Sequence, residues 1–181
     1  MGMTFVPAGL LSLAALSAVA LPVLAHAKTY ATVAEAQHAM FGAASMTQVR
    51  ILLSPAQQAR LRDASSVSLP FQGDRIWKTG DGGWFVVDEV VGKHEMITYA
   101  VGIDAAGTVR QIAVLEYQES YGSEVAEMQW RQQFVGKSAA SPLKLERDID
   151  NIAGATLSAK HLTDGVKRVM TMYELVLRHD K

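Results

Sequence analysis

The sequence is organised around one short stretch, Asp150-Asn151-Ile152-Ala153-Gly154-Ala155-Thr156-Leu157-Ser158. Gly154 permits a positive φ or a close backbone approach at this small-residue turn. The N-terminus of a helix carries free N–H groups and the positive end of the helix dipole, so it favours a phosphate beside the hydroxyl of Thr156. We therefore expect the rest of the chain to present this threonine. The helix is predicted from apolar residues that recur at four- and three-residue steps, namely Leu162, Val166, Val169, Tyr173 and Val176.

Length and composition limit both the fold and the partners. The chain has 181 residues, a formal net charge of -1 and 49% hydrophobic residues. These values predict a single domain over residues 28–181 with a sizeable core and no general attraction to nucleic acid. Because the chain has no cysteine, it cannot hold a disulfide framework, a cysteine-ligated iron–sulfur cluster or a haem attached through C-x-x-C-H.

The N-terminal segment is apolar. Residues 1–27 contain no Asp, Glu, Lys or Arg, and the stretch Leu10–Leu24 is rich in Ala and Leu. It ends in Ala25-His26-Ala27, an A-x-A cleavage pattern, so residues 1–27 are predicted to be a secretory signal peptide. The alternative is an uncleaved membrane anchor, because Phe5–Ala27 is nearly long enough to span a bilayer. Both interpretations place the body of the protein outside the cytoplasm.

Strand patterns dominate the middle of the chain. Residues 84–91 are rich in β-branched and aromatic side chains, and residues 95–103 alternate cleanly, with Ile97, Tyr99, Val101 and Ile103 on one face. Short turns separate the stretches. Consecutive strands with short connections pair antiparallel, so we expect a meander within a sheet of three to five strands. The expected strands cover residues 75–78, 84–91, 95–103 and 109–117.

Helical patterns flank this sheet, which makes the predicted fold class α+β. Ser54 and Pro55 are a typical N-cap and first-turn pair. The stretch 63–72 is small and polar, and is expected to be a loop or an irregular strand. In the segment 123–136, one helical face is expected from Val125, Met128, Gln129, Gln132 and Val135. The expected helices cover residues 33–41, 54–62, 123–136 and, as a long C-terminal helix, 156 to about 179.

Common catalytic and metal-binding motifs are not satisfied. His94-Glu95 begins an H-E-x-x-H pattern, but Thr98 stands where the second histidine would be, so no zincin site is expected. The remaining histidines are scattered, which is typical of surface positions rather than of metal ligands. We therefore expect no metal, and the sequence indicates no catalytic residue.

The motif Asp150-x-x-Ala153-Gly154-Ala155-Thr156 resembles the flavinylation motif of the FMN-binding domain family. That family includes the periplasmic FMN-carrying subunits of sodium-pumping NADH:quinone reductase and of the Rnf complex. Its pattern is Asp, two variable residues, Ser or Thr, Gly, Ala and Thr, so Ala153 departs from it. The resemblance implies a periplasmic protein with FMN attached to Thr156 through a phosphoester bond.

Two upstream segments extend the resemblance. Glu119-Ser120-Tyr121-Gly122 resembles the family's Glu-Thr-Pro-Gly turn, with Tyr121 in place of proline. Residues 130–137 are similar to the Trp…Phe…Gly-Lys stretch that follows that turn. The likeness therefore covers residues 117–177, and the strands before it are compatible with the family without being diagnostic.

The resemblance implies a set of cofactor-binding residues. Asp150 is either recognised by the modifying enzyme or caps the helix, and Lys137 either meets a phosphate or is solvated. Aromatic residues are candidates to cover the isoalloxazine ring, although core packing stays open for each of them. The set is Thr156, Asp150, Gly154, Ala155, Leu157, Ser158, Glu119, Tyr121, Gly122, Trp130, Phe134 and Lys137.

Together with the predicted export signal, the resemblance implies an exported electron-transfer flavoprotein that relays electrons between membrane or periplasmic redox proteins. The family implies maturation by a periplasmic flavin transferase that uses FAD and releases AMP. An electron carrier or a redox-complex subunit is favoured over an independent enzyme, because no His or Arg near the motif stands out as an acid or base. Two alternatives stay open: a flavin-dependent extracytoplasmic reductase, and a non-redox binding or assembly module in which residues 154–156 are only a helix entry.

Overall fold

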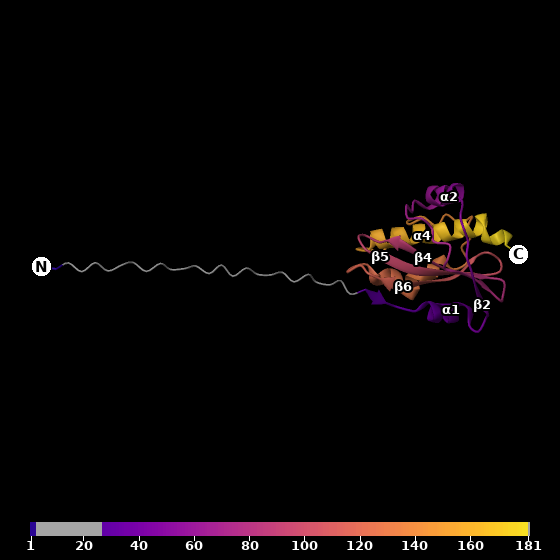
Figure 1. Cartoon of the computed structure of the whole chain (residues 1–181), viewed down its shortest axis with the longest axis horizontal. Helices are drawn as coiled ribbons and strands as arrows, with labels where there is room; N and C mark the ends of the chain where they lie inside the picture. The colour runs from indigo at the N-terminus through magenta and orange to yellow at the C-terminus, as the bar shows by residue number, and fades with distance from the viewer. Residues whose placement is uncertain (3–26, 181) are drawn as a thin grey trace.

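Six antiparallel strands form the sheet of this α+β fold (Figure 1), seen in a computed structural model that describes residues 1–2 and 27–180. The strand order is β1-β6-β5-β4-β3-β2. The meander predicted from the sequence corresponds to β3–β6, which pair consecutively. The strands are β1 (Lys28–Thr29), β2 (Met46–Val49), β3 (Ile76–Thr79), β4 (Trp84–Val91), β5 (Met96–Ile103) and β6 (Val109–Tyr117).

The expectation of three to five strands was too low, because two short strands add to the edges of the meander. β1 contributes two residues beside the end of β6, and β2 contributes four residues beside β3. Such short strands have no alternation of their own long enough to be recognised. Their pairing is imposed by the neighbouring strand rather than by local sequence.

Helices cover both faces of the sheet (Figure 1). On one face lies α4 (Thr156–Leu175), with α2 (Pro55–Ser65) packed against it. On the other face lies α1 (Val33–Phe41), whose Met40 and Phe41 pack on Phe85 of β4 and Ala100 of β5. Burial on both faces explains why β4 and β5 are apolar along most of their length rather than strictly alternating.

Local capping signals set the starts of the two N-terminal helices. Thr32 and Glu35 form a capping box at α1, and Ser54 and Gln57 form one at α2. The predicted bounds of α1 are confirmed. Helix α2 continues to Ser65, three residues beyond its expected end, and shortens the loop predicted over 63–72.

The segment after β6 differs from the single helix predicted over residues 123–136. Glu127 has extended backbone angles (φ -70, ψ 137), which interrupt the helical period. Met128 and Val135 were expected on a buried face, but they are 63% and 52% exposed. The buried side chains are instead those of Val125, Trp130 and Phe134. The three short pieces are η1 (Ser123–Ala126), α3 (Met128–Arg131) and η2 (Gln132–Phe134).

The C-terminal helix begins at Thr156, as predicted, and runs for 20 residues before the short η3 (Leu177–His179). Its predicted apolar face is confirmed along most of its length. The residues of that face inside α4 are all buried, namely Leu162, Val166, Val169 and Tyr173. Burial of this stripe against the sheet fixes which side of the helix faces solvent.

One charged side chain of α4 is also buried. Arg168 is 1% exposed, and its Nε and Nη2 lie 2.9 and 2.7 Å from Oδ2 of Asp88 on β4. The Tyr99 hydroxyl donates to the same oxygen at 2.7 Å. The carbonyl oxygens of Leu69 and Glu89 accept the remaining guanidinium hydrogen bonds at 2.7 Å. Because this network is directional, it fixes the position of α4 along the sheet.

The N-terminal predictions fall on residues that the structure does not describe. Residues 3–26 hold most of the predicted signal peptide and of the alternative anchor, so both stay predictions. In the part that is described, residues 1–2 and 27–180, no helix combines the length and apolarity needed to cross a membrane.

Candidate functional site

The first turn of α4 has unsatisfied backbone N–H groups. Its cap residue, Ala155, offers no side-chain acceptor, and no acidic residue lies in the first turn. Gly154 adopts a φ of +84° with open space around it, and Thr156 is exposed at the first helical position. An uncapped, uncrowded helix N-terminus of this kind fits a phosphate group. Ala153, the departure from the family motif, is exposed in the turn just before it.

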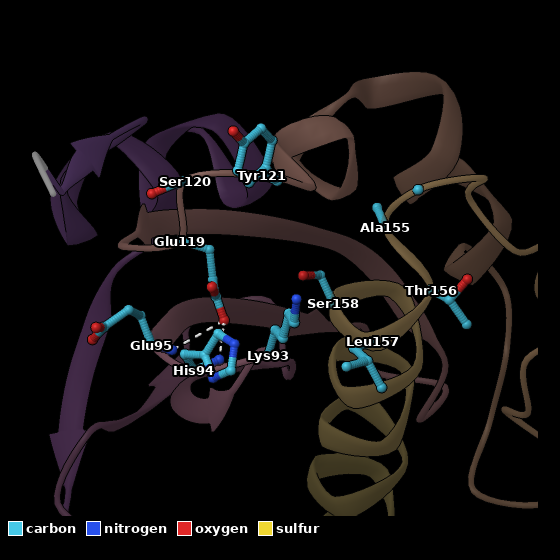
Figure 2. Close-up of a pocket in the computed structure, with 11 residues that line it drawn as sticks. Lys93, His94, Glu95, Glu119, Ser120, Tyr121, Ala155, Thr156, Leu157 and Ser158 are labelled. Carbon is cyan, nitrogen blue, oxygen red and sulfur yellow. Dashed lines mark hydrogen bonds between the residues drawn. The ribbon is translucent and has the colours of Figure 1, made fainter.

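A pocket of about 610 Å³ opens beside this helix start (Figure 2). Three segments that are distant in the sequence form it: the turn between β4 and β5, the chain after β6, and the beginning of α4. Its volume falls within the range of about 300–1,000 Å³ that is typical of small-molecule sites. The lining residues are Lys93, His94, Glu95, Glu119, Ser120, Tyr121, Gly154, Ala155, Thr156, Leu157 and Ser158.

Sheet register brings the first two segments together. Ile97 at the start of β5 pairs with Tyr117 at the end of β6, so the turn before β5 lies beside the chain that leaves β6. Glu119 Oε1 then accepts hydrogen bonds from the backbone N–H groups of His94 (2.5 Å) and Glu95 (3.0 Å). Burial raises the pKa of Glu119, but these amide hydrogen bonds outweigh it and hold the pKa below its usual range. The carboxylate is therefore ionised at neutral pH.

The hydroxyl of Tyr117 connects β6 to α4. It donates to the carbonyl oxygen of Tyr121 at 2.5 Å and lies 2.9 Å from Ser158 Oγ. Burial raises the pKa of this hydroxyl, which keeps it protonated as a donor. Gly122 packs against the same group with a φ of +89°, and a Cβ there would lie 2.7 Å from Tyr117 Oη. Only glycine combines that backbone angle with that close approach.

Most of the predicted cofactor-binding residues come together at this pocket. Gly122 lies directly behind the pocket wall, against Ser158 and Ala155. The side chains of Tyr121 (86% exposed) and Leu157 (43% exposed) form an apolar rim around the pocket. Exposed apolar groups beside a pocket are the kind of surface that covers a flat ring. The predicted residues in the lining are Glu119, Tyr121, Gly154, Ala155, Thr156, Leu157 and Ser158.

Trp130 and Phe134 lie in the core rather than in the pocket lining. Their rings form an edge-to-face pair with centroids 5.2 Å apart, and they are 7% and 0% exposed. The indole Nε1 of Trp130 donates to the backbone oxygen of Asp150 at 2.8 Å. This contact ties the segment that precedes α4 to the chain after β6, so the pair supports the site from behind.

The two remaining predicted residues also lie away from the pocket lining. Lys137 pairs with Asp148, with Nζ and Oδ2 3.1 Å apart. Asp150 lines a separate groove together with Glu124 and Glu127. The N-cap of α4 is Ala155 and receives no side-chain hydrogen bond, so Asp150 does not cap the helix.

The turn Lys93-His94-Glu95 was not predicted as part of the site. The only signal in the sequence was topological, because a meander places this turn at the same end of the sheet as residue 119. The turn itself carries no recognised motif. Within residues 1–2 and 27–180, neither it nor Glu119 belongs to a cluster of three or more side chains that could hold a metal ion.

Comparison with protein-family models matches residues 92–171 to the FMN-binding domain. All three segments of the pocket, residues 93–95, 119–121 and 154–158, lie inside the matched range. A search of curated proteins finds no match.

Proposed function

This chain carries an FMN-binding domain over residues 92–171, and on that premise we propose that it is an electron-transfer flavoprotein with FMN joined to Thr156 by a phosphoester bond. The domain itself indicates a flavin-carrying redox protein. The covalent proposal is carried by the position of Thr156. Its side chain is exposed at the first residue of an uncapped 20-residue helix, beside a pocket of ligand size.

Each wall of the pocket has its own part in holding the cofactor. The free N–H groups at the start of α4 bind the phosphate, and Gly154 and Ala155 are small enough to let it approach. The exposed rim residues Tyr121 and Leu157 cover the isoalloxazine ring. Glu119 holds the opposite turn in place through backbone amides. The flavin supplies one- and two-electron chemistry, which the protein positions and tunes.

Maturation requires a donor of FMN. We propose a periplasmic flavin transferase that uses FAD: a bond forms between Thr156 Oγ and the FMN phosphorus, and the pyrophosphate P–O bond breaks. AMP leaves, and the hydroxyl proton is released. The exported location follows from the predicted signal peptide. Covalent attachment keeps the flavin at a fixed effective concentration where a reversibly bound one would be diluted.

Electron exchange then takes place with membrane or periplasmic redox proteins. The flavin edge at the rim of the pocket is the point of exchange in this proposal. The first candidates for donor and acceptor are quinone-linked or ferredoxin-linked complexes and cytochromes.

The test is intact mass after co-expression with a flavin transferase, together with in-gel flavin fluorescence after denaturation. We expect the wild type to gain the mass of one FMN less one water, and Thr156→Ala to gain none. Ser120→Ala removes another exposed hydroxyl that lines the same pocket, so it is the matched control and keeps the gain. A wild type without added mass, or a Thr156→Ala variant that still gains it, would overturn the covalent assignment.

A further inference from the structure

Hydrogen bonds from two other segments hold the turn that joins β4 to β5. From β6, Glu119 accepts the backbone N–H groups of His94 and Glu95. From α4, the ring nitrogen Nδ1 of His161 lies 2.7 Å from the carbonyl oxygen of Gly92, so Nδ1 is the donor. Gly92 also packs closely on Glu119, because a Cβ at Gly92 would lie 2.8 Å from Oε1. A turn held by both the sheet and the helix projects its side chains from a fixed base.

Lys93 is the cation that this turn presents to the pocket. In Figure 2 its side chain points into the space between Glu119 and the start of α4, whereas the Glu95 carboxylate lies on the side remote from α4. Among residues 1–2 and 27–180, the ion pairs involve other side chains and leave the Lys93 ammonium without a carboxylate partner. The negative charge of Glu119 is directed to backbone amides instead.

The two ends of the pocket differ in chemistry. Thr156 and the N–H groups of α4 mark the end that suits the phosphate. Lys93, His94 and Glu95 form the facing wall, at the other end of the lining. A flavin that had its phosphate at Thr156 and lay along this pocket would place its ring, rather than its phosphate, beside the Lys93 ammonium.

We propose that Lys93 tunes the flavin: its ammonium lies against the isoalloxazine ring and stabilises the negative charge that the ring gains on reduction. This inference rests on the proposed function. The redox partner supplies the electrons, and Lys93 makes and breaks no bond. A positive charge beside the ring favours the electron-rich form, just as a nearby charge favours the oppositely charged form of any titrating group.

The test is the redox potential of the full chain loaded with FMN, measured by spectroelectrochemistry on protein whose mass confirms one flavin per chain. An opposite charge within about 4–6 Å shifts an ionisation by tenfold or more. We expect Lys93→Met and Lys93→Gln to shift the flavin equilibrium about tenfold toward the oxidised form, which is about 30 mV for a two-electron couple. Lys93→Arg keeps the charge and should stay within about twofold of the wild type.

Glu95→Gln is the matched control, because it removes one unit of charge from the same turn on the side remote from α4. A contact between Lys93 and the ring predicts a much smaller shift for Glu95→Gln than for Lys93→Met. The inference is wrong if the charge-removing variants match the wild type, or if Glu95→Gln shifts the potential as far in the opposite direction. It is also wrong if Lys93→Arg shifts as far as Lys93→Met. A wild type that gains no flavin mass contradicts the proposed function instead, so the two failures are distinguishable.

Discussion

Gly122 gives the most direct test of how the pocket is assembled, because Gly122→Ala introduces two separate costs. The first is backbone strain, since an L-residue held at a φ of +89° costs about 1–2 kcal/mol. The second is steric, since the new Cβ would lie 2.7 Å from Tyr117 Oη and 3.1 Å from Ser158 Oγ. Displacing the Tyr117 hydroxyl loses its hydrogen bonds to Tyr121 and Ser158, each worth about 0.5–1.5 kcal/mol. We expect a total loss of about 3 kcal/mol in the free energy of unfolding.

The measurement is urea-induced unfolding followed by circular dichroism, with the slope m compared between variants. Gly136→Ala is the matched control, because Gly136 has a φ of +78° but nothing within 4 Å of the position of a Cβ. It should show the backbone cost alone, about 1–2 kcal/mol. If Gly122→Ala proves no more destabilising than Gly136→Ala, the contact between the turn and α4 contributes nothing and the reasoning fails.

Three further predictions address the core and the pH dependence. Arg168→Met leaves Asp88 as an uncompensated buried charge, so we expect a loss of about 3–5 kcal/mol in urea unfolding; a loss below 1 kcal/mol would contradict the role of the network. Phe134→Ala empties a fully buried ring position and should lose about 3–5 kcal/mol by the same assay, whereas the exposed Val135→Ala should lose less than about 0.5 kcal/mol. The pKa of Glu119 is lowered by folding, so its stabilisation is fully present above the ordinary value of about 4.3 and is lost as the pH falls through the folded pKa. The urea midpoint of the wild type should therefore approach that of Glu119→Gln on acidification, and a constant gap between the two would refute the assignment.

Elements with their own local signals were predicted with accurate bounds. Trp84–Val91 was assigned to β4 from β-branched and aromatic content, Val109–Tyr117 to β6 as the strand that returns after a turn, and Val33–Phe41 to α1 from its helical period. Where structure is imposed by a neighbour, local sequence carries no signal. Met46–Val49 is a strand because β3 lies beside it, and Glu127 is extended because Val125 and Trp130 must both reach the core.

The candidate site was predictable only in part, for a similar reason. The residues around Thr156 and Glu119 carry motifs, and the structure brings these two segments together at one pocket. Trp130 was a candidate to cover a ring because composition shows an aromatic residue but not the direction in which it points. Lys93 was missed because its place depends on the hairpin geometry and on the anchors from Glu119 and His161, which are contacts between distant parts of the chain.

The pocket joins segments that reach it over very different lengths of chain. The turns at 92–95 and 119–122 belong to one antiparallel meander, and the pairing of its consecutive strands β5 and β6 brings them together. Thr156 comes from α4, and packing α4 against β4 and β5 brings together parts of the chain that are much farther apart in sequence than the two turns are. The site is therefore complete only when α4 is packed on the sheet. A group bound across the pocket therefore holds α4 in its docked position and stabilises the folded chain. If that group is covalently attached, this stabilisation does not decline on dilution. The attached group would then connect the start of α4 to the turns of the meander at every protein concentration.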